Sequence, residues 1–140
     1  MSVAVASVVL DTNVALDLLV FADPRAQPLH CALDAGSLRW IATPDMRQEL
    51  ERVLAYSRIA RYLTGQGHDA QRVLARFDAL AQVVERAAAS RVRCSDRDDQ
   101  IFIDLALAHT ALLLSKDAAV LSLRKRLAAH GVAVHAFMPP

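Results

Sequence analysis

Two aspartates follow apolar stretches of the kind that form buried strands. Asp11 ends the apolar stretch that begins at Val3, and Asp117 lies three residues beyond the stretch 112–114. Because ligands bind beyond the carboxyl ends of the strands in open α/β sheets, we expect both side chains at one rim of the sheet. Either residue alone would also be explained as a helix N-cap, so the pair is more informative than each member.

Two further acids are predicted to lie on helices. In the helix that Pro44 opens, Glu49 borders the apolar arc, so a solvated position and a position over a cleft both remain open. Asp99 shares a helical face with Phe102, and we therefore expect its side chain to point inward. Asp104 lies on the opposite side of that helix, where a peripheral charge is expected.

These four carboxylates would repel one another and raise each other's pKa values if they lay close together. A divalent cation relieves that repulsion, and a set of oxygen ligands without His or Cys favours Mg²⁺ or Mn²⁺ over zinc. One or two such ions activate water and neutralise charge on a phosphoryl group, so the pattern predicts phosphodiester hydrolysis. The predicted catalytic and metal-binding residues are Asp11, Glu49, Asp99 and Asp117.

The elements that must position these acids alternate along the chain. Residues 44–88 are predicted to be helical, with breaks around 56–57 and at 65–67. Such alternation indicates an α/β sandwich with a mostly parallel sheet. The expected strands are 3–10, 38–42, 111–114 and 132–137, and the other expected helices are 14–20, 26–35, 98–108 and 118–129.

The composition limits the class of protein. The chain has 140 residues, 54% of them apolar, which fits one globular domain and excludes general disorder. Its formal charge of +1 does not by itself indicate a nucleic-acid partner. Cys31 and Cys94 are too few for a disulfide framework or a four-cysteine zinc site. With neither a signal peptide nor a membrane helix expected, we predict a soluble cytoplasmic protein.

An RNA substrate would require cations near the acids, because phosphate contacts dominate affinity. The candidates are Arg58, Arg61 and Arg97, whose segments flank the acids, and Lys116, which adjoins Asp117. Aromatic residues make up only 5% of the chain, and no stretch interleaves them with basic residues. We therefore expect no base-stacking platform within a single segment.

Taken together, these segments resemble a known family. Residues 9–14, 43–54, 96–102, 105–108 and 114–117 are similar, in order, to the PIN-domain nucleases grouped as VapC-like toxins of bacterial toxin–antitoxin systems. The shared pattern is D-T-N-V, E-L-x-x-V-L, D-x-x-D and S-x-D. The resemblance implies one PIN-like domain over 1–140, built as a three-layer α/β/α sandwich.

The resemblance also assigns roles to individual residues. It matches the four predicted acids to the metal-binding acids of the family, with Asn13 orienting Asp11 and Ser115 accompanying Asp117. Arg97 stands where relatives often have proline, so Asp96 remains open as an additional ligand or a supporting residue.

The family implies an endoribonuclease dependent on Mg²⁺ or Mn²⁺. VapC-like members form homodimers and are inhibited by a small antitoxin encoded beside them. An aspartyl-phosphate phosphatase would require a second aspartate where Asn13 stands, and a receiver domain would require paired acids at Asp11. A PIN fold that binds RNA or a protein without cleaving it remains the alternative.

Overall fold

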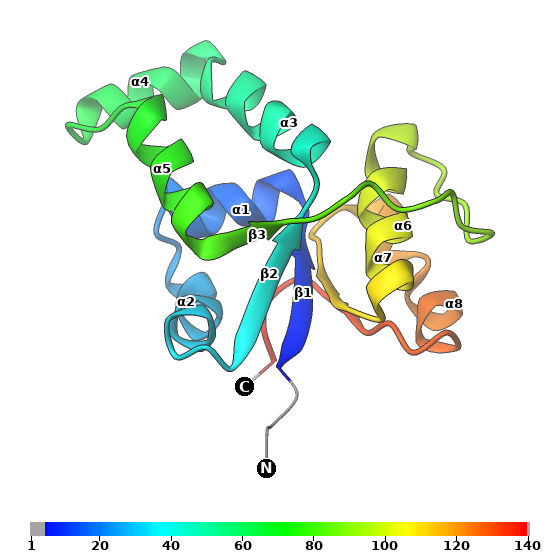
Figure 1. Ribbon diagram of the computed structural model, residues 1–140. Coiled ribbons are helices and arrows are strands. Elements are labelled where there is room, and N and C mark those ends of the chain that lie inside the picture. Colours follow the sequence, from blue (N-terminus) through cyan, green and yellow to red (C-terminus); the bar gives the residue numbers. More distant parts are fainter. Residues whose placement is uncertain (1–4, 140) are drawn as a thin grey trace.

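The computed structural model describes residues 5–139, and a five-stranded parallel sheet forms its centre (Figure 1). The strand order is β3-β2-β1-β4-β5, so the first strand of the chain lies in the middle. Val8 on that strand pairs with Trp40 on one side and with Leu112 on the other. The strands are β1 (Ala6–Leu10), β2 (Leu38–Ala42), β3 (Ala81–Val83), β4 (Leu112–Leu114) and β5 (Val134–His135).

Helices cover both faces of the sheet, with α1, α2 and α5 on one side and α6, α7 and α8 on the other (Figure 1). The predicted α/β/α sandwich is therefore confirmed, and every strand pairing is parallel. The α-helices are α1 (Thr12–Leu19), α2 (Gln27–Asp34), α3 (Pro44–Leu54), α4 (Ser57–Gly65), α5 (Ala70–Leu80), α6 (Gln100–His109), α7 (Ala118–Leu121) and α8 (Arg124–Ala128), and η1 (Pro24–Ala26) and η2 (Arg97–Asp99) are 3-10 turns.

The central strands are apolar at successive positions because helices bury both of their faces. Val8 and Val9 on β1 and Leu113 on β4 are completely buried. Trp40 on β2 packs edge-on against Phe77 of α5, with ring centroids 4.9 Å apart. This packing fixes the strands whose carboxyl ends carry the candidate acids.

The prediction that the helical region extends to residue 88 was wrong for its last residues. Helix α5 ends at Leu80, and Ala81–Val83 form the edge strand β3 beside Trp40–Ala42 of β2. Pairing supplies partners for backbone groups of β2 that would otherwise remain unsatisfied, and this tertiary gain outweighs local helix propensity. Residues 84–96 then form an irregular connection without helix or strand.

Several predicted elements were also too long, and one predicted helix is divided in two. The expected helix 118–129 is divided into α7 and α8, and the expected strand 132–137 shortens to Val134–His135. Strand β1 begins at Ala6, while residues 3–4 of the predicted strand lie outside the described residues. Within residues 5–139, no helix combines the length and hydropathy needed to cross a bilayer.

Candidate active site

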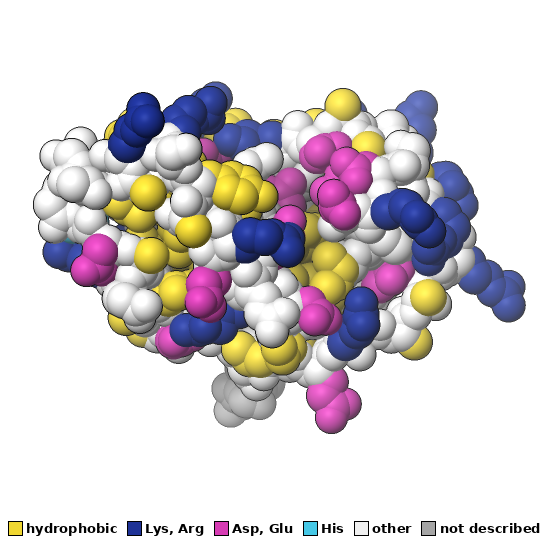
Figure 2. All heavy atoms as spheres, turned by 90° about the horizontal axis from the view of Figure 1, so that it is seen from above, with side chains coloured by type: hydrophobic (Ala, Val, Ile, Leu, Met, Phe, Trp, Pro, Cys, Tyr) yellow, Lys and Arg dark blue, Asp and Glu magenta, His cyan; other side chains and the backbone are white. Residues whose placement is uncertain are grey.

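The candidate site lies where β1 and β4 end side by side. Leu10 pairs with Leu114, and the backbone N–H of Asp11 donates to the Leu114 carbonyl at 3.1 Å. Seen from above this edge, acidic side chains gather in a hollow with hydrophobic side chains beside them (Figure 2). A pocket of about 230 Å³ is lined by all four predicted acids, Asp11, Glu49, Asp99 and Asp117, together with Thr12, Asn13, Val53, Tyr56 and Phe102.

Asp11 is held by the protein on both carboxylate oxygens. It is the N-cap of α1, where Oδ1 accepts from the Val14 N–H at 3.0 Å. Its Oδ2 accepts from the hydroxyl of the fully buried Ser115 at 2.5 Å. Burial raises the pKa of Asp11, and the bonds from Ser115 and Val14 oppose that rise. Ser115 therefore stabilises the charged form of Asp11, although sequence had associated it with Asp117.

Ser115 also contacts the residue with which it was first associated. Its Oγ accepts from the backbone N–H of Asp117 at 3.1 Å. One buried hydroxyl thus connects the carboxylate that follows β1 with the turn that follows β4.

Glu49 reaches the pocket from α3, and its Oε2 accepts from the hydroxyl of Thr12 at 3.0 Å. Glu49 was expected at the border of the apolar face of its helix, and its side chain is indeed half-buried at the pocket edge. Thr12 was missed as a functional residue, although its place directly after Asp11 was a signal. Asn13 lines the pocket with an exposed side chain, and in residues 5–139 no hydrogen bond joins it to Asp11.

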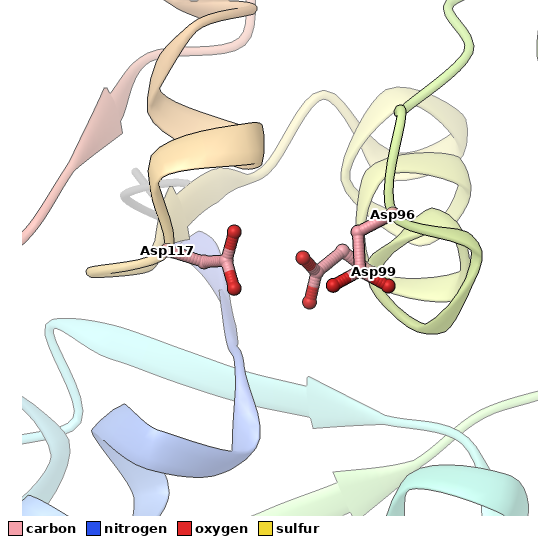
Figure 3. A group of neighbouring side chains, drawn as sticks. All are labelled: Asp96, Asp99 and Asp117. Carbon is pink, nitrogen blue, oxygen red and sulfur yellow. The ribbon is translucent and has the colours of Figure 1, made fainter.

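Two of the pocket acids, Asp99 and Asp117, form a tighter group with Asp96, which adjoins the pocket. The carboxylates of Asp96, Asp99 and Asp117 each offer an oxygen, and these oxygens lie within 4.8 Å of one another (Figure 3). Asp96 caps η2 through the Asp98 N–H, and Asp117 caps α7 through the Ala119 N–H. The sequence left the position of Asp96 open, and the structure places it in this group.

Asp99 is the least satisfied member of the group. Asp99 is only 9% exposed, and within residues 5–139 its buried Oδ2 has no hydrogen-bond partner. Burial, followed by the charges of Asp117 and Asp96, raises the pKa of Asp99 to about 7. Buried polar atoms rarely lack a partner, and a proton or a cation at this oxygen would relieve the repulsion from the neighbouring carboxylates.

The chemistry of these side chains fits a divalent cation. Carboxylate oxygens alone are the ligands that Mg²⁺ and Mn²⁺ prefer. A cation beside Asp99 would supply the missing partner of Oδ2 and offset the repulsion from Asp96 and Asp117. Asp11 and Glu49 lie outside the tight group but line the same pocket.

A polar network holds the irregular segment that leads to Asp96. Oδ1 of Asp104 accepts from the Ser90 N–H at 3.0 Å, the Ser90 hydroxyl at 2.7 Å and Nε2 of Gln100 at 2.8 Å. Oε1 of Gln100 accepts from the Cys94 N–H at 2.7 Å. The expectation of a peripheral charge at Asp104 was wrong, because this carboxylate ties the segment to α6.

The predicted phosphate-binding cations have different surroundings. Arg58, Arg61 and Arg97 are exposed, and Arg58 lines a cavity beside the acidic pocket. Nζ of Lys116 instead lies 2.5 Å from Oδ2 of Asp17, so part of its charge is already balanced by this ion pair.

Comparison with known families identifies the chain over most of its length. A family model described as PIN domain matches residues 7–119. This range includes every acid of the pocket and ends within α7. No curated protein matches the chain.

Proposed function

The chain belongs to the PIN-domain family, whose members are generally nucleases, and from this membership we propose that it is a metal-dependent endoribonuclease. The observation that carries the proposal is the buried Oδ2 of Asp99, which has no donor and belongs to a carboxylate within 4.8 Å of two others. Carboxylates this close together repel one another, and a bound cation relieves that repulsion.

In this proposal Asp96, Asp99 and Asp117 hold Mg²⁺ or Mn²⁺, and Asp11 and Glu49 complete the acidic wall around one or two ions. The bound ion supplies charge neutralisation at the phosphoryl group and lowers the pKa of water. The hydrogen bond from Ser115 favours the charged form of Asp11 and orients it, and Thr12 holds one oxygen of Glu49. The RNA backbone approaches through the open side of the pocket, toward which exposed arginines such as Arg58 can steer it.

The finer part of the proposal is that the protein is the toxin of a type II toxin–antitoxin pair. It rests on the ordered similarity of the five segments to VapC-like toxins, and it implies a cytoplasmic homodimer inhibited by a small antitoxin encoded nearby. Expression in a bacterial host should arrest growth, and coexpression of the adjacent small open reading frame should restore it. Harmless expression of an active enzyme would contradict the toxin role and leave the nuclease.

The nuclease itself is tested with purified protein and single-stranded RNA. We expect cleavage with Mn²⁺, loss of cleavage in EDTA, and loss in Asp11→Asn and Asp99→Asn. Asp98→Asn is the matched control, because Asp98 is exposed on the same turn as Asp99 but does not line the pocket. Equal activity in all variants would identify a contaminating nuclease, and RNA binding without cleavage would identify a silent binding module.

A further inference from the structure

A second and larger cavity adjoins the acidic pocket along α1, α3 and the start of α4. Its volume is about 400 Å³, and Asn13, Val53 and Tyr56 line it as well as the acidic pocket. A molecule that places a phosphodiester at the acids can therefore extend directly into this cavity.

The cavity has an apolar wall and one exposed aromatic ring. Tyr56, between α3 and α4, is 55% exposed and lines the cavity. Phe21 and Ile59 contribute further apolar surface. Tyr62 supports Phe21 by an edge-on contact with ring centroids 5.0 Å apart. The apolar wall at Phe21 is thus held in place by packing within the chain.

The polar groups of the cavity are few and match a nucleotide. Arg58 is the cation in the lining, and Asn13 offers an amide that can both donate and accept. Single-stranded RNA is recognised by aromatic side chains on which bases stack, with cations along the phosphates. Paired bases are already stacked within a helix, so only an unpaired base can enter.

We propose that this cavity, the Tyr56 pocket, binds one unpaired nucleobase next to the phosphodiester held at the acids. The base stacks on Tyr56, Arg58 contacts a flanking phosphate, and Asn13 contacts the base edge. This inference rests on the proposed ribonuclease function and adds a binding site for one base of the substrate. Continuity with the acidic pocket and the presence of Arg58 favour a nucleotide over an apolar segment of a protein partner.

Sequence could not reveal this site, because its aromatic residues come from separate segments. Tyr56 follows α3, while Phe21 follows α1 and is supported by Tyr62 from α4. The fold instead assembles a candidate platform from several segments.

The first test measures binding without cleavage. A short single-stranded RNA carrying 2-aminopurine is titrated in Mn²⁺ with Asp11→Asn protein, which we expect not to cleave, and stacking on Tyr56 should quench its fluorescence. The Tyr56 variants are made in the same Asp11→Asn background. In Tyr56→Ala the quenching should disappear and affinity should fall about 5- to 150-fold, the range expected for one base–aromatic stack. Tyr56→Phe, which keeps the ring, should retain both. Equal affinity and quenching in Tyr56→Ala would overturn the proposal.

The second test uses cleavage with Mn²⁺. Tyr56→Ala should raise KM for single-stranded RNA, and an RNA with an abasic site at the stacked position should show the same loss even with wild-type protein. Unchanged KM for both in an active enzyme would overturn the Tyr56 pocket while leaving the nuclease intact. Absence of cleavage by wild-type protein would instead contradict the proposed function, and the fluorescence test, which does not depend on cleavage, would still decide the pocket.

Discussion

The two sides of the acidic pocket differ in how the protein treats its carboxylates. On one side, Asp11 accepts from Ser115 and Val14, and Glu49 accepts from Thr12. On the other side, Asp99 has a buried oxygen without a donor, close to two more acids. We call the first the satisfied side and the second the cation-dependent side. On the second side Asp96 and Asp117 each accept one backbone N–H, but Oδ2 of Asp99 has no hydrogen-bond partner in residues 5–139.

From this difference we propose that Asp99 and its two acidic neighbours gain most from a bound cation, while Asp11 and Glu49 are positioned mainly by the chain. A carboxylate with its own donors keeps its place whether or not a cation is bound. A carboxylate among like charges is costly in the charged form until a cation arrives, and binding free energy is then gained from relief of repulsion. Substitutions on the two sides should therefore have different signatures in stability and in metal binding.

The largest effect is expected for Asp99→Asn. Removing this ligand should lower Mn²⁺ affinity about 100-fold or more, because even the loss of a group that merely supports a ligand costs 10- to 100-fold. The metal-free variant should remain as stable as the wild type near pH 7.5, since one of three crowded charges is removed. Calorimetric titration and thermal unfolding measure both quantities.

The exposed neighbour Asp98 is the control for that substitution, and Asp98→Asn should bind Mn²⁺ as the wild type does. If Asp99→Asn kept normal Mn²⁺ affinity, the unsatisfied side of the pocket would have no special role in binding a cation.

The second prediction concerns pH. The pKa of Asp99 is raised to about 7 in the folded metal-free protein, far above its ordinary value of 3.8. Because the folded state binds this proton more tightly, the contribution of Asp99 to stability is present below pH 3.8 and is lost as pH rises through 7. Cation binding requires the deprotonated form, so Mn²⁺ affinity should rise about tenfold per pH unit below 7 and level off above it.

Titrations with Mn²⁺ between pH 5.5 and 8.5 give the binding profile, and unfolding in EDTA gives the stability profile. Asp99→Asn should flatten both curves in the region below pH 7. A Mn²⁺ affinity independent of pH in the wild type would show that no acid of the pocket holds a proton before the cation binds.

The satisfied side is tested by Ser115→Ala, which leaves Oδ2 of Asp11 buried without a donor. An unsatisfied buried acceptor costs roughly 1–3 kcal/mol, so the free energy of unfolding should fall by about that amount. Urea denaturation in EDTA measures the loss, and Ser115→Thr serves as the variant that keeps the hydroxyl. Full stability in Ser115→Ala would mean that Asp11 does not depend on this hydrogen bond.

The smallest effect is expected for Thr12→Val, which removes the donor to Glu49 while keeping the shape of the side chain. Because Glu49 is half-buried and water can replace the hydroxyl, we expect a loss of stability of about 1 kcal/mol or less. Ribonuclease activity should fall several-fold, and Thr12→Ser should retain it. If Thr12→Val lost as much ribonuclease activity as Asp99→Asn, Glu49 would belong with the acids that depend on the cation.

The location of the acids could be predicted because parallel strands bring their carboxyl ends to one edge. That rule placed Asp11 and Asp117 together, and helical phase brought Asp99 toward them. The same reasoning could not decide on Asp96, since its position depends on the path of residues 84–96. That path is fixed by hydrogen bonds to Asp104, which helical phase had assigned to the periphery.

Other features depend on contacts between distant segments. The edge strand β3 forms because β2 offers it partners, although the local sequence continues the helical pattern. Thr12 reaches Glu49 across 37 residues of sequence, and the Tyr56 pocket combines residues from α1, α3 and α4. Local propensity and spacing carry no direct signal for such contacts.

The most direct test of the cation site is diffraction from crystals grown with Mn²⁺, using its anomalous signal to locate the ion. We expect a peak in direct contact with carboxylate oxygens of Asp99 and Asp117, with Asp96 beside it. Crystals without a peak at these residues, or with Mn²⁺ bound solely by Asp11 and Glu49, would contradict the division of the pocket into a satisfied side and a cation-dependent side.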